Sequence, residues 1–397
     1  MHPADMNTRP YAGMKVIDLS QGVAGPYCAM LLGQYGADVI KIEPLEGGDW
    51  SRGLGKRRGD QTAYSIPVNL GKRSLALDLK QPEGCDILWR LVRGADVFVQ
   101  GFRPGVIERL GFGYSAVSAR EPQILYVSIS GFGQTGPLAE RPAMDPVLQA
   151  FTGLIVENAG EDGVPHRIPI VAIDMSTALY AFSAVAPALF ARLREGKGRH
   201  IEASLMDAAA GLQVIRILQQ QFEDGKLPPA SAPNGVYATR DGWISLTVAR
   251  PQDWVAFCQA LDLGWMREDS RFATIDGRIA HAELMRAELR PMFAGQPFAH
   301  WSERLAAHKV MHERLNAYRD FLAHSHTAAT GAVAWVEHPQ VPDPVPLPNL
   351  IGLPPFKSGD PRAIAPGLGE HSAAILREYG YGDAEVADLR ARKVIGG

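Results

Sequence analysis

Asp174 is the residue in this sequence with the clearest potential for chemistry. It follows an apolar run, residues 168–173, that is typical of a strand, and it precedes an apolar stretch, residues 175–195, that is typical of a helix. An aspartate at this junction can cap the helix by accepting hydrogen bonds from its first N–H groups, and position alone favours that role. It can also be a nucleophile, because the helix dipole favours the ionised carboxylate, which can attack an acyl group. Asp145 is a second loop carboxylate, which alone is more typical of a solvated or capping residue.

A group of basic residues is the second feature with chemical potential. Six of them lie close together, with few acidic residues between them: Arg52, Lys56, Arg57, Arg58, Lys72 and Arg73. Such a group can be a solvated face, or it can bind a multiply phosphorylated ligand, because arginine forks pair with phosphate oxygens. Lys80 with Arg103 or Arg109 would extend that site.

Other motifs of cofactor and metal enzymes are missing or incomplete. Residues 131–136 match the pattern GxGxxG after a predicted strand, but Pro137 and Pro142 prevent a regular helix from opening there, so the anion site of a dinucleotide fold is lost. We interpret these glycines as loop residues. The sequence contains no Walker A motif, no HExxH and no GxSxG. The histidines are scattered, and we expect no metal site, including at His324 and His326.

Composition narrows the class of protein. The 397 residues carry 40 basic and 43 acidic side chains, a net charge of −3, which argues against a generally basic nucleic-acid binder. Three cysteines far apart, with no CxxC, suit a reducing compartment. The polar first ten residues lack the apolar core of a signal peptide. The run 178–193 contains Ser183 and Pro187 and predicts a buried helix rather than a membrane span. We therefore expect a cytoplasmic enzyme without a membrane or nucleic-acid partner.

Strand and helix patterns alternate along the first 130 residues. Strands are predicted at 14–19, 38–43, 75–79, 96–99 and 124–130, with helices at 27–35 and 82–93. This alternation indicates a mostly parallel sheet with helices on its faces, and such sheets bind ligands at the carboxyl ends of their strands. A further strand is predicted at 200–204 and a helix at 206–222, while Pro187 is expected to kink or break the helix 175–195.

Two proline-rich stretches, residues 226–233 and 338–356, mark changes in organisation. The second is expected to be extended. Between them, residues 236–239 and 243–248 predict a hairpin. The sequence therefore predicts the first part of a large Rossmann-like domain at 1–225, a smaller α+β domain with its linker at 226–330, and a segment at 331–397 that returns to the large domain.

Short motifs recur in order along most of the chain. They are VIDL at 16–19, AGP at 24–26, GADVIKIE at 36–43, GKRS at 71–74, LDLK at 77–80, FRPGV at 102–106, RLG at 109–111, GFGQTGP at 131–137, GKGR at 196–199 and PGLGEH at 366–371. Together they resemble the class III CoA-transferases, the CaiB–BaiF family. The resemblance implies a large Rossmann-like domain, a smaller domain and a homodimer of two subunits interlocked like linked rings. It also implies that CoA moves from an acyl-CoA, such as succinyl-CoA, to a small carboxylic acid, with CoA as substrate and no permanently bound cofactor.

The resemblance also assigns catalytic roles. Asp174 aligns with the family's nucleophile, which forms a mixed anhydride with the acyl group and then an aspartyl-CoA thioester. Asp145 matches a second active-site carboxylate of the formyl-CoA branch. These matches favour the nucleophile over the cap for Asp174, although one residue can do both, and they disfavour a CoA-binding protein without activity.

The resemblance extends to CoA contacts. The predicted CoA-binding residues are Val23, Leu77, Lys80, Phe102 and Arg109, joined by Arg52 and Arg103 from the basic group. Val23 and Gly101 stand where the formyl-CoA branch has Gln and Asn, and that branch's tetraglycine loop is missing. These departures argue against formyl or oxalyl substrates.

The α-methylacyl-CoA racemases of the same superfamily are the alternative. Two of their four acid–base groups would stand where this chain has Met144 and Arg250, and neither a thioether nor an always-protonated guanidinium can shuttle a proton. Racemase chemistry is therefore disfavoured. Arg250 is left as either an ordinary surface residue or a group that faces the carboxylate of a dicarboxylic substrate.

Overall fold

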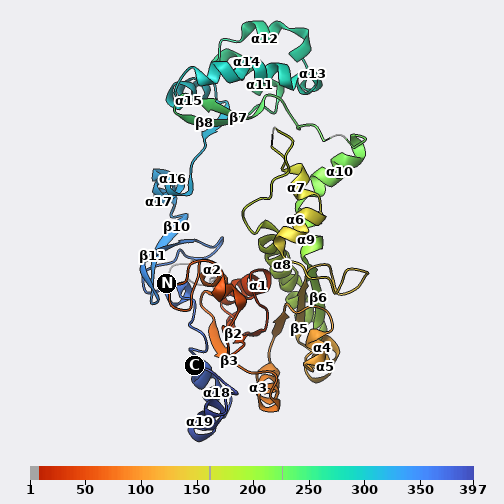
Figure 1. Ribbon diagram of the computed structural model, residues 1–397, viewed down its shortest axis with the longest axis vertical. Helices are drawn as coiled ribbons and strands as arrows, with labels where there is room; N and C mark the ends of the chain where they lie inside the picture. The colour runs from red at the N-terminus through yellow and green to blue at the C-terminus, as the bar shows by residue number, and fades with distance from the viewer. Residues whose placement is uncertain (1–8, 161, 226) are drawn as a thin grey trace. The chain divides into compact units, whose positions relative to one another are not determined.

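The computed structural model describes residues 9–160, 162–225 and 227–397. Most of the ten-residue segment tested for a signal peptide therefore lies outside the described residues. The chain divides into two compact units (Figure 1). The larger unit comprises the residues up to Val214 together with Gly331–Gly397, and the smaller unit comprises Ile215–Thr330.

The larger unit is built on a parallel sheet. Its strands are β1 (Lys15–Asp18), β2 (Asp38–Glu43), β3 (Arg73–Ala76), β4 (Val97–Gln100), β5 (Leu125–Ser130) and β6 (Arg199–Ser204). In the described residues these six strands lie in the order β3-β2-β1-β4-β5-β6, and every neighbouring pair is parallel. The alternating strand–helix pattern of the sequence therefore predicted a mixed α/β fold correctly.

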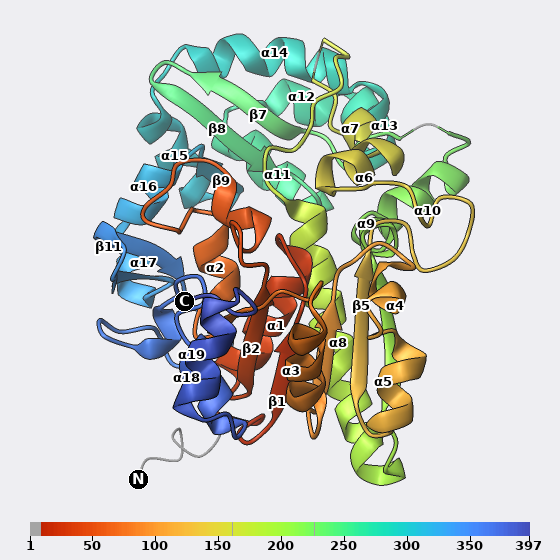
Figure 2. The ribbon, with the colours of Figure 1, turned by 60° about the horizontal axis from the view of Figure 1, so that its bottom comes forward.

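Helices cover both faces of this sheet. The helices of the larger unit are α1 (Ala24–Gln34), α2 (Ser65–Asn69), α3 (Pro82–Val92), α4 (Val106–Arg109), α5 (Tyr114–Arg120), α6 (Asp145–Phe151), α7 (Leu154–Glu157), α8 (Ala172–Glu195), α9 (Leu205–Leu212), α18 (Ser372–Glu378) and α19 (Asp383–Ala391), with short 3-10 helices η2 (Trp50–Gly53) and η4 (Pro361–Ala363). Successive strand residues point to opposite faces, so Val16 packs with α1 and α8 whereas Ile17 packs with α3, α18 and α19. Figure 2 shows α3 and α8 on the two sides of the strands.

The predicted strand at 168–173 is wrong. Residues 162–171 form no strand, and α8 already begins at Ala172. Pro169 has no backbone N–H to donate to a neighbouring strand, and Ile170 is 53% exposed. The apolar run thus forms an irregular segment that leads into the helix.

Helix α8 is continuous through Pro187, so the predicted break does not occur. Among the described residues it is the one helix whose length and composition would allow it to cross a membrane. One side, including Ala181, Val185 and Leu189, is buried against the sheet, which is typical of the core helix of an α/β unit. The expectation of a buried helix holds for this side alone, because the opposite side exposes large apolar residues.

The predicted helix 206–222 is two helices, α9 and α10 (Val214–Phe222). The other elements of the smaller unit are α11 (Pro251–Ala260), α12 (Gly264–Glu268), η3 (Ser270–Phe272), α13 (Ile275–Ala280), α14 (Ala282–Ala294), α15 (Phe298–Ala307), α16 (Tyr318–Ala323), α17 (Ser325–Thr330) and the strands β7 (Asn234–Thr239), β8 (Gly242–Thr247) and β9 (Met311–Arg314). The antiparallel pairing of β7 with β8 confirms the predicted hairpin.

The last segment of the chain completes the larger unit. β10 (Val333–His338) and β11 (Val341–Pro348) form an antiparallel pair. The extended conformation of β11 agrees with the prediction for residues 338–356, whereas β10 and the pairing were not predicted. Beyond them, α18 and α19 pack on the sheet, and Leu77 pairs with Ile395. The last segment of the chain thus contacts the carboxyl end of β3, where Gly396 N–H also donates to the Ala76 carbonyl.

Candidate active site

A cavity of about 170 Å³ in the larger unit contains both candidate carboxylates. It is lined by Val23, Trp50, Leu54, Tyr64, Met144, Asp145, Pro146, Gln149, Arg167, Ile168, Pro169, Ile170, Val171 and Asp174. Asp174, Asp145 and Val23 were predicted site residues, and the fold brings these three together.

Asp174 is the third residue of α8, and it does not cap the helix. The N-cap position is Val171, whose side chain makes no capping hydrogen bond. The cap comes instead from Asp145: its Oδ2 atom accepts hydrogen bonds from the N–H groups of Ile173, at 2.7 Å, and of Asp174, at 3.1 Å. A carboxylate from another helix thus satisfies the first turn of α8, which leaves the Asp174 carboxyl free for the cavity.

Gln149 holds Asp145 and the irregular segment in one arrangement. It lies one turn after Asp145 on α6, and its Nε2 atom donates to Asp145 Oδ1 at 2.6 Å. Its Oε1 atom accepts from the Ile168 N–H at 3.0 Å, and Nε2 also lies 3.2 Å from the Ile168 carbonyl oxygen. These contacts replace the strand pairing that the apolar sequence of the segment suggested.

The environment of Asp174 changes its acidity. Burial and, to a smaller extent, the nearby Asp145 charge together raise the pKa of Asp174 to about 7. Near neutral pH the carboxyl is therefore divided between its acid and ionised forms. Its nucleophilic form gains population as the pH rises through about 7.

A turn after β1 and the start of η2 form another wall of the cavity. Gly22 has φ +85°, and a Cβ atom there would collide with the Trp50 ring, so glycine is required. Asp49 ties these parts together, because its Oδ1 atom accepts from the N–H groups of Gly22, at 2.8 Å, and Ser51, at 2.9 Å. Its Oδ2 atom accepts from Lys41 Nζ at 2.8 Å. The position of Val23 and Trp50 therefore depends on a buried charge.

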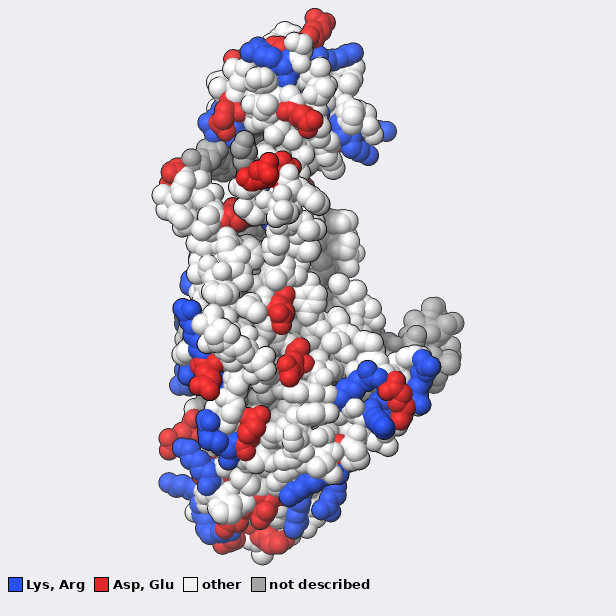
Figure 3. Space-filling view, turned by 90° about the vertical axis from the view of Figure 1, so that its right-hand side faces the viewer, with Lys and Arg blue, Asp and Glu red and all other residues white. Residues whose placement is uncertain are grey.

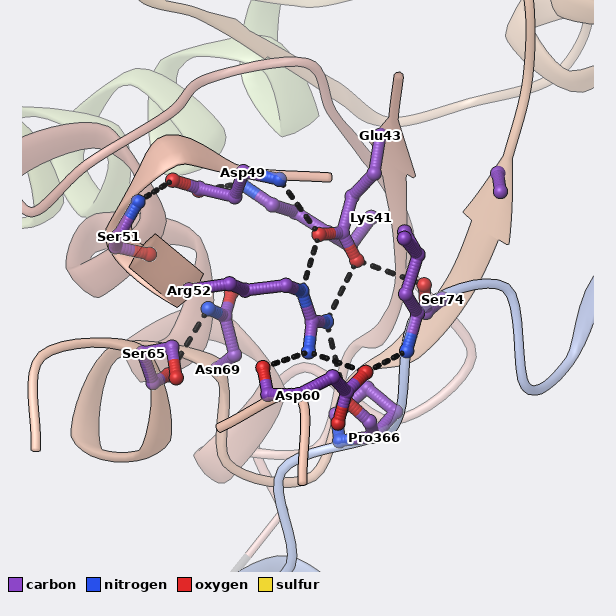
Figure 4. A network of polar contacts seen from close by, with 12 residues as sticks. Lys41, Glu43, Asp49, Ser51, Arg52, Asp60, Ser65, Asn69, Ser74 and Pro366 are labelled. Carbon is purple, nitrogen blue, oxygen red and sulfur yellow. Dashed lines mark hydrogen bonds and ion pairs between the residues drawn. The ribbon is translucent and has the colours of Figure 1, made fainter. Parts of the chain in front are cut away.

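Arg52 belongs to the same buried network and is not available to CoA, contrary to the prediction (Figure 4). Its Nε and Nη2 atoms donate to the two Glu43 carboxylate oxygens at 2.7 and 2.8 Å. Nη1 lies 3.2 Å from Asp60 Oδ2, and Nη2 donates to the Pro366 carbonyl at 3.1 Å. The residue is 1% exposed. Its guanidinium therefore links β2, the loop at Asp60 and the C-terminal segment at Pro366.

Two further members of the basic group are also structural. Lys72 is buried and donates to Asp18 Oδ2 at 2.8 Å, to the Pro26 carbonyl at 2.7 Å and to Asn69 Oδ1 at 2.9 Å. Burial lowers the pKa of Lys72 to about 8, against the opposing charge of Asp18. Arg73 pairs with Asp38 on β2 at 2.6 Å. Charges that looked clustered in sequence are thus neutralised by partners from β1 and β2.

The remaining predicted CoA contacts follow the carboxyl ends of β3 and β4. Phe102 is half-buried, and its N–H donates to Gln100 Oε1 at 2.8 Å. The Leu77 side chain is 2% exposed and packs in the core, so the prediction that it contacts CoA does not hold for its side chain. The exposed cations of this region are Lys80, Arg103 and Arg109. They do not line the described cavity.

Sequence reasoning missed Trp50, Tyr64 and Arg167 as cavity residues. Arg167 precedes Asp174 by seven positions, and its place directly before the apolar run was the one signal that could have drawn attention to it. Trp50 and Tyr64 lie in loops, whose positions a sequence pattern does not give. In the smaller unit, Arg250 pairs with Asp253, with Nη2 at 2.8 Å from Oδ1.

Comparison with known proteins supplies an independent line of evidence. The family model for CoA-transferase family III matches residues 11–372. The chain is 33% identical to an acetyl-CoA:oxalate CoA-transferase from Acetobacter aceti over 384 residues, which cover 95% of this chain and 97% of the relative. It is 31% identical to a succinyl-CoA:glutarate CoA-transferase from Homo sapiens over 402 residues, covering 99% and 91%. A crystal structure of a CAIB/BAIF family protein from Brucella suis matches with a TM-score of 0.79 at 31% identity, covering 94% of this chain and all of that one.

Proposed function

The chain belongs to the CoA-transferase family III, and we propose that it moves CoA from an acyl-CoA to a free carboxylic acid through a covalent bond to Asp174. The observation that carries this proposal is that the Asp174 carboxyl lies in the cavity, in the first turn of α8. It does not cap the helix, because Asp145 accepts the hydrogen bonds of the first N–H groups. A carboxylate whose pKa lies near 7 is a stronger nucleophile than an ordinary aspartate and is still substantially ionised at neutral pH.

The proposed reaction has two symmetrical halves. Ionised Asp174 attacks the thioester carbonyl of the donor, and the C–S bond breaks to give a mixed anhydride and CoA thiolate. The thiolate attacks the Asp174 carbonyl, which releases the donor acid as a carboxylate and leaves an aspartyl-CoA thioester. The acceptor carboxylate attacks that thioester, and the thiolate released then attacks the acceptor's acyl carbon. A new acyl-CoA forms and Asp174 returns as a carboxylate, with no net transfer of protons.

We assign Asp145 a positioning role in this reaction. Its Oδ2 atom engages the N–H groups at the start of α8, so these donors are not free to stabilise a developing oxyanion. What Asp145 supplies is a fixed Asp174 backbone and a negative charge that strengthens the base. For CoA, the larger unit offers Val23 and Phe102 for the pantetheine and the exposed Lys80, Arg103 and Arg109 for the phosphates. CoA enters as substrate, and the chemistry needs no permanently bound cofactor.

The test is a transfer assay on the full chain with succinyl-CoA, acetyl-CoA and longer donors against a panel of carboxylic acids. We expect a new acyl-CoA that forms only when both a donor and a free acid are present. Absence of transfer to every acid would overturn the proposal. Incorporation of solvent deuterium at the α-carbon of a 2-methylacyl-CoA would instead indicate the racemase alternative, which Met144 in the cavity wall does not favour.

Replacing Asp145 by Asn should change the pH dependence of transfer. Asparagine can still accept hydrogen bonds from the start of α8, but it removes the charge that raises the Asp174 pKa. Activity of the wild type is expected to fall as the pH drops through about 7, because Asp174 becomes protonated. In Asp145→Asn this fall should move by about one pH unit to lower pH. The measurement is kcat/KM against pH, since it reports the free enzyme.

Glu195→Gln is the matched control for this shift, because Glu195 is an exposed acid at the other end of α8. It should leave the profile unchanged. An acid limb that stays near pH 7 in Asp145→Asn would show that burial alone sets the acidity of Asp174.

We further propose that the protein is a homodimer. The outer side of α8 exposes Phe190 and Leu193, the latter 81% exposed, and a groove of about 310 Å³ lies along α8, β6 and α9. Figure 3 shows this side of the larger unit as a mostly uncharged surface. An apolar surface of this kind is typical of an interface. The linked-ring arrangement of the two subunits rests on the family resemblance.

Sedimentation of the full chain tests the dimer. The wild type should sediment with twice the mass of one chain, and the double substitution Phe190→Asp with Leu193→Asp should shift it toward the monomer. A wild type that remains monomeric at micromolar concentration would refute this proposal.

We also propose that the protein works in the cytoplasm. The three cysteines are free thiols, which is typical of proteins from a reducing compartment. Cell fractionation checks this, and recovery of the protein outside the cytoplasm would contradict it.

A further inference from the structure

We propose that Arg167 binds the second carboxylate of a dicarboxylic substrate, so that the acids served by Asp174 are short dicarboxylic acids. The inference rests on the proposed function and narrows its substrate class. Arg167 lines the cavity that holds Asp174 and Asp145. Among the described residues that line this cavity it is the one with a positive charge, while Trp50, Leu54 and their neighbours are largely apolar.

The backbone beside Arg167 is fixed, whereas its side chain is available. Gln149 engages both the N–H and the carbonyl group of Ile168, the next residue, so the chain at 167–168 is tied to α6 and thus to Asp145. Arg167 itself is exposed and has no ion-pair partner among the described residues. Arg52 and Arg250, by contrast, are paired with carboxylates. A guanidinium without a partner on an anchored backbone suits the recognition of an anion, since no existing ion pair has to be broken.

Charge complementarity indicates which anion. An acid that enters this cavity meets Asp145 and Asp174, so its approach is opposed unless a cation compensates. The reacting carboxylate must reach Asp174, and a second carboxylate at the far end of a short chain would meet the Arg167 fork, which pairs with carboxylates through two parallel hydrogen bonds. At about 170 Å³, the cavity has room for the equivalent of about five or six water molecules. This volume limits the length of the carbon chain between the two carboxylates of the substrate.

The experiment compares matched acids in the full-length protein. The acceptors are succinate and glutarate against butyrate and valerate, which have the same chain lengths but one carboxylate, with acetyl-CoA as donor. The variants are Arg167→Gln, Arg167→Lys and the control Arg377→Gln, whose residue is an exposed arginine on α18. In the wild type we expect the dicarboxylates to be preferred. Arg167→Gln should lower kcat/KM for the dicarboxylates by about ten- to a hundredfold, mainly through KM, and leave the monocarboxylates within about twofold.

Each outcome decides between named possibilities. Arg167→Lys should retain part of the preference, because it keeps the charge without the fork, and Arg377→Gln should change nothing. An unchanged dicarboxylate preference in Arg167→Gln would overturn the inference and leave the proposed function standing. An equal rise in the KM of acetyl-CoA with every acid would place Arg167 on CoA instead and also overturn it. Continued transfer to valerate would show that Arg167→Gln is folded. If the wild type transferred CoA to none of the acids, both the proposed function and this inference would be overturned.

Discussion

Asp174→Ala is expected to lower CoA transfer by about 10⁴-fold or more, because removing a covalent nucleophile leaves only substrate binding and positioning. The substitution should not disturb the fold. Asp145 accepts a hydrogen bond from the backbone N–H of residue 174, which alanine keeps, so the start of α8 remains capped. Burial disfavours the ionised form of Asp174, so its loss should leave stability at neutral pH unchanged or higher.

Kinetics and covalent trapping together measure this effect. Transfer is followed for the wild type, Asp174→Ala and Asp174→Asn, with a thermal melt and a CoA-binding titration on each. In the wild type, acyl-CoA without an acceptor followed by hydroxylamine or borohydride should modify the peptide that contains Asp174. The variants should bind CoA with nearly unchanged affinity and show no modification there. Normal turnover by Asp174→Ala, or a trapped adduct on another residue, would remove Asp174 from the role of nucleophile.

The sheet could be predicted from the sequence because its strands are short, β-branched and separated by helical patterns. The strand predicted at 168–173 has the same apolar composition, yet Ile170 is exposed and the segment is held by Gln149 rather than by a neighbouring strand. Composition indicates how apolar a segment is. It does not indicate which group forms hydrogen bonds with the N–H and C=O groups of that segment, and here that group is the Gln149 side chain on α6.

The same distinction applies to the site. Asp174 and Asp145 could be assigned through the family resemblance, but the capping contact between them depends on the tertiary meeting of α6 and α8. The basic group was misread for Arg52, because the acids that neutralise it, Glu43 and Asp60, approach it only in the folded chain. Arg167 was missed because a single sequence does not show which charged side chains lack an ion-pair partner in the folded chain.

The buried network around Arg52 should be one of the most sensitive parts of the protein. Arg52→Met is expected to reduce the free energy of unfolding by about 3–5 kcal/mol, because it leaves the Glu43 carboxylate buried without its main partner. The lower end of this range is expected, since Asp49 N–H and Ser74 Oγ still donate to Glu43, at 3.0 and 2.7 Å. Pro366 likewise keeps the Gln61 Nε2 donor at 2.7 Å.

Urea unfolding of Arg52→Met beside Arg57→Met separates this structural role from a role in binding CoA. Arg57 is an exposed neighbour in the same basic group whose Nε atom donates to the Arg52 carbonyl oxygen at 3.0 Å, so its substitution should change stability by no more than about 1 kcal/mol. Burial raises the pKa of Glu43, but the hydrogen bonds and charge of Arg52, helped by the charge of Lys41 and the Asp49 N–H, outweigh it and hold that pKa below its usual range. The contribution of the pair is therefore present above the unfolded pKa of glutamate and is lost as the pH falls, so the deficit of Arg52→Met should shrink in acid. If Arg52→Met had wild-type stability but bound CoA more weakly, the structural role would be wrong and Arg52 would be a CoA-binding residue.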